Sequence, residues 1–421
     1  MFRAVFLTSD RSEDDFVGIR FHDEENTVNV YFPHGFKVSE NEIEKRKDAI
    51  KLLSVMRKFS EKREGETVDQ FEKNLENLPL PSYRYIIYDY LQNGYYIEKD
   101  RIISRDTRGN IQWKKTIRTE KPIIDNDSVA FLKFKVNSNR IDENNLLTII
   151  HKACVYQAFY RFGWLFIEKP FLPTKHELPL GDLECISLLK KASSNTFNDN
   201  KRKLFQSMID IINDSSNSSN SKNVSIGVKR FQAIWENVID YIYGCDDKEK
   251  YNPRAEWISI NNEYQSIMNL HPMRIDTVMK VFDPEYKLFI LDAKYYKAGI
   301  GGDLPGASDI QKQLAYSKSA HEQDKNLLEK QNVYNAFIIP YSSNDKNYLK
   351  PIYIGKISSE DYSDKLNEKY VVAVLADTKT LLSTYKKKDD QRIKDMASCI
   401  ESALTLYKNR INGNDRVSLN G

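Results

Sequence analysis

Two acidic residues and a lysine in the second half of the chain have the types and spacing for phosphodiester chemistry. Asp276 ends a short apolar run, and Asp292 and Lys294 end the run Lys287–Lys294. The second run is rich in aromatic and branched residues, which predicts a β-strand. Residues two apart on a strand share one face, and a hairpin would place Asp276 beside Asp292. Two carboxylates and a lysine suit a Mg²⁺ site that polarises a phosphodiester and activates a water molecule.

The Asp-x-Lys spacing is a weak signal by itself, because 29% of the residues are charged. A solvated strand end is the alternative interpretation. The second carboxylate, the apolar flanks of both runs and the polar helix predicted next favour a site. The arrangement resembles the core of PD-(D/E)XK nucleases, with Asp276, Asp292 and Lys294 at the three motif positions. Ile275 stands where the family name has proline.

That resemblance implies two further site residues. A helix before the acidic strands often supplies another carboxylate in this superfamily, and Glu236 in the amphipathic run Phe231–Gly244 is the matching candidate. The alternative is a solvent-facing glutamate. A later helix carries a glutamine and a tyrosine, matched by Gln313 and Tyr316, although Gln-x-x-x-Tyr is the more common spacing. The implied catalytic set is Asp276, Asp292, Lys294, Glu236 and Gln313, with Mg²⁺ (or Mn²⁺ as a substitute) held by Asp276, Asp292 and Glu236.

The remaining sequence divides at a polar segment. Residues 213–223 (NDSSNSSNSKN) contain no apolar side chain, so they predict a flexible linker. The part after it, residues 224–421, is predicted to be an α/β nuclease domain with a mixed sheet flanked by helices. The part before it, residues 1–212, is predicted to be an α+β region for DNA recognition or partner docking. Its expected strands lie at 3–7, 16–21, 27–32, 95–98, 101–104, 110–118 and 129–135, and its expected helices at 40–63, 83–93, 144–162 and 199–213.

One stretch before the linker resembles a particular family within the nuclease superfamily. Residues 94–98 (GYYIE) and 109–117 (GNIQWKKTI) resemble the "GxYIE … GxIxWKxTI" region of LlaJI-type restriction endonucleases, which stand near the McrC nuclease subunits. The resemblance covers much of residues 83–341. It implies cleavage of double-stranded DNA in a restriction system, and a McrB-like GTP-driven motor as partner. The alternative interpretation of Trp113 and Ile117 is that they are buried core residues of a strand. The alternative for Lys114 and Lys115 is that they are solvated and do not bind phosphate.

Composition excludes few functions. The 421 residues carry a net charge of +3, so binding of nucleic acid needs a local basic patch. The four cysteines are far apart without zinc spacing and predict free thiols in a reducing cytoplasm. No signal peptide or long apolar run occurs, which predicts a cytoplasmic protein that does not enter a membrane. The oligomeric state, including a homodimer, is left open.

The sequence therefore predicts a Mg²⁺-dependent, type II-like site-specific deoxyribonuclease. One alternative is a structure-specific repair or transposon nuclease of the same superfamily. The other is a DNA-binding subunit without catalysis, against which the intact Asp276, Asp292 and Lys294 speak.

Overall fold

The chain forms two compact units, each described here by itself. The computed structural model describes residues 2–9, 15–62, 78–125, 128–142, 145–218, 225–254, 256–258, 267–269, 273–282, 284–296, 304–324, 327, 332–343, 347–357, 367–385 and 389–411. Unit 1 comprises Met1–Ala4, His22–Thr27 and Asn77–Val224, and unit 2 comprises Val5–Phe21, Val28–Glu76 and Ser225–Gly421. No helix among these described residues is both long enough and apolar enough to pass through a lipid bilayer.

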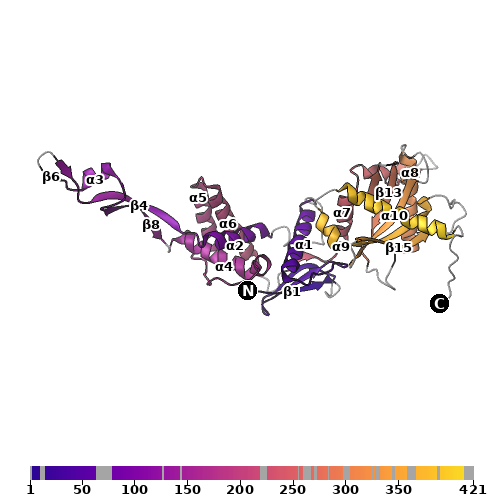
Figure 1. Ribbon diagram of the computed structural model, residues 1–421, viewed down its shortest axis with the longest axis horizontal. Helices are drawn as coiled ribbons and strands as arrows, with labels where there is room; N and C mark the ends of the chain where they lie inside the picture. The colour runs from indigo at the N-terminus through magenta and orange to yellow at the C-terminus, as the bar shows by residue number, and fades with distance from the viewer. Residues whose placement is uncertain are drawn as a thin grey trace. The chain divides into compact units, whose positions relative to one another are not determined.

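A five-stranded mixed sheet forms the core of unit 2 (Figure 1). Its order is β12 (Thr277–Val281), β13 (Lys287–Ala293), β14 (Val333–Tyr341), β16 (Tyr370–Asp377) and β15 (Leu349–Lys356). The three central strands β13, β14 and β16 are parallel, whereas the two edge strands are antiparallel to their neighbours. The predicted mixed α/β fold of this region is confirmed. Its assignment to the PD-(D/E)XK core stays a prediction.

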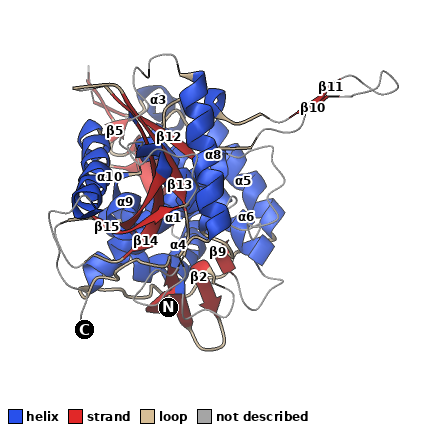
Figure 2. Ribbon diagram, turned by 90° about the vertical axis from the view of Figure 1, so that its right-hand side faces the viewer, coloured by secondary structure: helices blue, strands red, loops and turns tan. Residues whose placement is uncertain are grey.

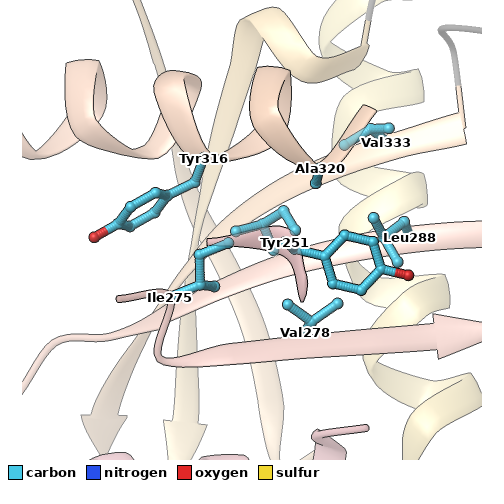
Figure 3. Packing of buried hydrophobic residues seen from close by; sticks show 8 residues of the cluster. Tyr251, Ile275, Val278, Leu288, Tyr316, Ala320 and Val333 are labelled. Atoms are coloured by element: carbon cyan, nitrogen blue, oxygen red, sulfur yellow. The ribbon is translucent and has the colours of Figure 1, made fainter. Parts of the chain in front are cut away.

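Helices pack against this sheet because its strands are apolar on both faces. Every residue of β16 is buried, and all of β13 beyond its first residue, as is usual for strands covered on two sides. The helices of unit 2 that follow β9 are α7 (Gln232–Tyr243), α8 (Ala307–Gln323), α9 (Thr378–Thr384) and α10 (Asp390–Ile411). Tyr316 and Ala320 of α8 pack on Leu288 and Val278 of the sheet (Figure 3).

A second, four-stranded sheet joins the N-terminal residues to unit 2. Its order is β1 (Arg3–Thr8), β3 (Thr27–Phe32), β2 (Val17–His22) and β9 (Ser225–Val228). Gly18 has φ of +142°, and a Cβ there would lie 2.2 Å from the carbonyl oxygen of Ile226. Only glycine allows this close pairing. Helix α1 (Glu42–Lys62) follows, and its buried Asp48 pairs with Lys379 at 2.6 Å.

The contacts group the chain differently from its order in sequence. Unit 2 includes residues 5–21 and 28–76 together with the C-terminal part, whereas unit 1 includes residues 77–224. The assignment of recognition or docking to residues 1–212 and of nuclease chemistry to residues 224–421 stays a prediction. Helix α6 (Asp199–Ser218) also continues through the first six residues of the expected linker. The rest of that linker, residues 219–223, lies outside the described residues. The expected strands at 3–7, 16–21 and 27–32 are confirmed.

Unit 1 combines a helical part with a strand-rich part (Figure 1). Its helices are α2 (Leu80–Asn93), α3 (Trp113–Thr119), α4 (Leu146–Phe166), α5 (Asp182–Ser194) and α6. Its strands are β4 (Glu98–Asp106), β5 (Asn110–Ile111), β6 (Ile123–Asp125), β7 (Ser128–Ala130) and β8 (Phe134–Asp142). β8 pairs with β4 over nine positions and with β5 over two.

The strand expected over residues 110–118 is wrong beyond Ile111, because Trp113–Thr119 form α3. Tertiary contacts favour the helix. Thr116 is fully buried and its Oγ1 accepts a hydrogen bond from the backbone N–H of Lys135, while the Gln112 N–H donates to the carbonyl of Lys135. These two bonds hold α3 on β8. Consequently Trp113 and Ile117 are not strand core: their side chains are 54% and 63% exposed.

Candidate active site

The hairpin of β12 and β13 brings the two predicted metal-binding aspartates together. Thr277 pairs with Leu291 in the antiparallel ladder, so the next position outward sets Asp276 opposite Asp292. The backbone N–H of Ala293 donates to Oδ2 of Asp276 at 3.3 Å. Asp292 is 6% exposed, so its carboxylate is almost completely removed from solvent. The expected neighbourhood of the two carboxylates is therefore present.

The electrostatics of this pair are unfavourable for two bare anions. Burial raises the pKa of Asp276 well above its ordinary value, and the nearby charges of Asp292 and Glu236 raise it further. A buried carboxylate near two others is costly unless a cation offsets the charge. The pair thus has the charge of a cation site.

Lys294 supplies one positive charge beside the pair. Its Nζ lies 3.0 Å from Oδ2 of Asp292 and 2.9 Å from Oδ1 of Asp309 on α8. Burial alone would lower the pKa of Lys294, but the two carboxylates outweigh it and raise the pKa. The same ammonium group lowers the pKa of Asp309 against the opposing effect of burial. Lys294 is therefore a fixed cation at the end of β13.

Glu236 reaches the same site from α7. It lines a cleft of about 750 Å³ together with Asp276, and Gln232 one turn earlier donates a hydrogen bond to its Oε1 at 2.9 Å. The α7 face also carries Asp240, whose Oδ2 lies 2.8 Å from Nζ of Lys248. Lys248 donates to the backbone carbonyl of Asp276 at 2.6 Å. This lysine connects α7 to the start of β12 and holds Asp276 in place.

Gln313, in contrast, is not in the cleft. It is fully buried, and its Nε2 donates to the carbonyl of Ile290 at 2.7 Å, which supports β13 two residues before Asp292. Through this hydrogen bond Gln313 helps to position β13. A catalytic role for Gln313 stays a prediction. The preceding residue, Lys312, is exposed and hydrogen-bonds Tyr316.

Sequence reasoning missed Lys312, Lys248 and Asp309. Lys312 had a signal, because it stands four residues before Tyr316, where the more common spacing has glutamine. The electrostatic influence of Asp292 reaches Lys312 and contributes to raising its pKa, against burial, which would lower it. Lys248 lies in the charged run Asp246–Lys250, which by pattern alone indicates a solvated segment.

The residues present fit a magnesium ion held in part by solvent. Within the described ranges, no three His, Cys, Asp or Glu side chains gather closely enough to hold a metal ion by themselves. Mg²⁺ usually keeps several waters and binds proteins through one or two carboxylates plus substrate phosphate. Asp276 and Asp292 provide such a pair, with Glu236 across the cleft. The metal-ligand role of Glu236 stays a prediction.

These features define a mixed α/β protein with an acidic, lysine-bearing site at the end of its central sheet. The chain belongs to the LlaJI restriction endonuclease family, whose pattern it matches over residues 16–353. It is 28% identical over 321 residues to the Type II restriction enzyme BsuMI component YdjA of Bacillus subtilis (strain 168). That match covers 71% of this chain and 66% of the relative, so the chain spans just under two thirds of the relative's length.

Two solved structures of Thermococcus gammatolerans proteins are similar at lower levels. One is a half-complex of McrB AAA+ hexamers with bound McrC, at 16% identity and a TM-score of 0.33, covering 92% of this chain and 82% of that one. The other is the McrBC complex, at 17% identity and a TM-score of 0.21, covering 47% of this chain and 58% of that one. Neither score establishes a shared fold.

Proposed function

We propose that this protein is the nuclease component of a restriction system and cleaves double-stranded DNA with Mg²⁺ at Asp276 and Asp292. The observation that carries the proposal is the pairing of the half-buried Asp276 with the buried Asp292 across the β12–β13 hairpin, with Lys294 fixed beside them. Family membership supports a nuclease over other phosphodiester chemistry. In the proposed assignment the sheet and helix α8 are those of a PD-(D/E)XK core.

Each side chain then has a separate task. Asp276 and Asp292 bind the cation, which when present polarises the phosphodiester and acidifies a bound water. Lys294 places a positive charge where the attacked phosphate becomes most anionic, which stabilises the transition state. Glu236, held by Gln232 and lining the same cleft as Asp276, would orient water molecules bound to such a cation. Lys248 keeps Asp276 in register by holding its carbonyl.

The proposal predicts metal-dependent cutting by the purified full-length chain. Plasmid and phage DNA would be incubated with Mg²⁺, Mn²⁺, Ca²⁺ or a chelator, with and without a McrB-like GTPase, and the cut ends sequenced. We expect cleavage with Mg²⁺ or Mn²⁺, and none with Ca²⁺, because Ca²⁺ takes looser and higher coordination. Cutting that persists undiminished in the chelator would refute the metal mechanism. Ends scattered without any sequence preference would refute site specificity.

We further propose that unit 1 docks a McrB-like GTPase through an apolar surface around α3. Six large apolar side chains between residues 113 and 132 are about half exposed or more, namely Trp113, Ile117, Ile123, Ile124, Val129 and Leu132. Trp113 and Ile117 are four residues apart and so share one face of α3. Exposed apolar groups concentrated in this way mark interaction sites. The curated relative is named as a component of an enzyme, which supports action with other subunits.

Replacing Trp113 and Ile117 by alanine is expected to weaken motor binding about 10³-fold, because each exposed anchor at an interface contributes about 2 kcal/mol. Binding would be measured by titrating the variant against a McrB-like GTPase. The matched control replaces Leu183 and Phe197, which are 84% and 94% exposed elsewhere in unit 1. Motor binding equal to that of the control would rule out docking through α3.

A further inference from the structure

Two arginines in the active-site cleft have no acidic partner among the residues that the structure describes. The cleft is lined by four basic side chains, those of Lys248, Lys250, Arg254 and Arg274. Lys248 is neutralised by Asp240 at 2.8 Å and Lys250 by Asp247 at 2.9 Å. Arg254 and Arg274 are exposed, and no ion pair is found for either of them within the described part of the chain. Two uncompensated guanidinium groups therefore lie in a cleft that also holds Asp276 and Glu236.

The backbone on which these arginines stand is fixed on both sides. The N–H of Met273 donates to the carbonyl of Pro253 at 3.1 Å, so the residue before Arg254 and the residue before Arg274 are joined directly. The Oδ1 of Asn252 accepts from the N–H of Ile275 at 2.9 Å. The two segments thus run side by side, and the arginines are neighbours in space although twenty residues separate them in sequence.

Contacts with the sheet and with α8 also hold the segment that contains Arg274 and Ile275. The hydroxyl of Tyr316 donates to the carbonyl of Arg274 at 2.8 Å, and Ile275 is buried in the cluster around Tyr316 (Figure 3). Between the two arginines in sequence, the chain forms the β10–β11 hairpin, Glu256–Ile258 with Ile267–Asn269 (Figure 2). The two arginines therefore lie on either side of the β10–β11 pair in sequence.

We propose that Arg254 and Arg274 bind the backbone phosphates next to the scissile phosphodiester and so place the DNA strand across Asp276 and Asp292. This inference rests on the proposed nuclease function. Guanidinium groups match phosphate oxygens with two parallel hydrogen bonds. Arg274 is two residues from Asp276, at most about 7 Å along an extended backbone, so its side chain reaches a phosphate adjacent to the one bound at the carboxylates.

The negative charge of the three carboxylates is the reason that DNA binding needs these two arginines. Asp276, Asp292 and Glu236 repel a polyanion, and Lys294 is already shared between Asp292 and Asp309. Contacts to phosphate position a nucleic acid without reading its sequence. The arginine pair should therefore add affinity equally for cognate and random DNA, and the scissile bond should be misplaced when the pair is lost.

The test measures DNA binding separately from cleavage. In the full-length chain carrying Asp292→Asn, which prevents cutting, Arg254→Ala, Arg274→Ala and the double variant would be titrated with cognate and random duplexes at several salt concentrations. We expect each single change to lower affinity about tenfold at low salt and to reduce the slope of log K against log salt by about one. The losses should be equal for the two duplexes. The lysine variants, which keep the charge, should retain the slope.

Arg410→Ala is the matched control, because Arg410 is exposed in the last turn of α10 and does not line the cleft. A slope unchanged from this control in both alanine variants would overturn the proposal. So would a loss confined to cognate DNA, which would mean that the arginines read bases. The proposed function is judged by metal-dependent cutting in the chain with both arginines intact, so failure of one proposal is distinguishable from failure of the other. Equal melting temperatures for the lysine and alanine variants exclude unfolding as the cause.

Discussion

Replacing Asp292 by asparagine is expected to lower the cleavage rate about 10³-fold or more while leaving the fold intact. The change removes one negative charge from the proposed metal site, and the interactions of such a cation contribute several kcal/mol to the transition state. Asparagine has nearly the shape of aspartate, and Lys294 keeps its second partner, Asp309, at 2.9 Å. Packing of β13 is therefore preserved.

Thermal unfolding provides a readout of this variant that does not depend on activity. In chelator, the melting temperature of Asp292→Asn should equal or exceed that of the wild type, because the charge that raises the pKa of Asp276 is gone. Mg²⁺ should stabilise the wild type, since a ligand bound only by the folded state raises stability, and should not stabilise the variant. Asp309→Asn is the control: it also removes a carboxylate from Lys294, and it should retain stabilisation by Mg²⁺. Undiminished Mg²⁺-dependent cutting by Asp292→Asn would eliminate this site.

Replacing Lys294 by methionine is expected to abolish most cleavage without weakening metal binding. The ammonium group is 3.0 Å from Asp292, and removing a single preorganised charge from a transition state typically lowers the rate 10²- to 10³-fold. The cation site itself becomes more negative in this variant, so affinity for Mn²⁺ should be kept or increased. Calorimetric titration with Mn²⁺, alongside the rate of plasmid cutting, measures both quantities.

A conservative variant separates the charge of Lys294 from its shape. Lys294→Arg keeps a cation next to Asp292 and Asp309, so it should recover part of the rate, although a planar guanidinium is not equivalent to an ammonium group. Loss of Mn²⁺ affinity in Lys294→Met together with residual cutting would contradict the assigned role, because it would make the lysine a support of the metal site.

The part of the site that is local in sequence was predictable. Asp276, Asp292 and Lys294 lie on two consecutive strands, and alternation along a strand determines which side chains share a face. The contacts that hold these residues come from farther away. Asp309 on α8 and Lys248 before β12 are joined to the site only by the tertiary fold, and their surroundings in sequence are those of ordinary charged surface.

Two features of the fold were not predictable from local sequence for the same reason. The residues 110–118 suit a strand by composition, and the buried Thr116 and its bond to Lys135 of β8 favour a helix from Trp113 on. The second feature is the pairing of β2 with β9, about 200 residues later. The sequence of a strand does not show which distant strand it pairs with. The polar composition of the segment before β9, in contrast, can be recognised directly in the sequence.

The pairing of β2 with β9 also has a consequence for the order of events during synthesis. Most of unit 1 is inserted between α1 and β9 of unit 2, so β2 leaves the ribosome long before its partner. At roughly 5–20 residues per second, the delay is about 10 to 40 s. Domains generally fold as units while the chain is made, so unit 1 can fold during this interval. Asp276, Asp292 and Lys294 are translated only afterwards, and the proposed catalytic residues are therefore added to the nascent chain after unit 1 is complete.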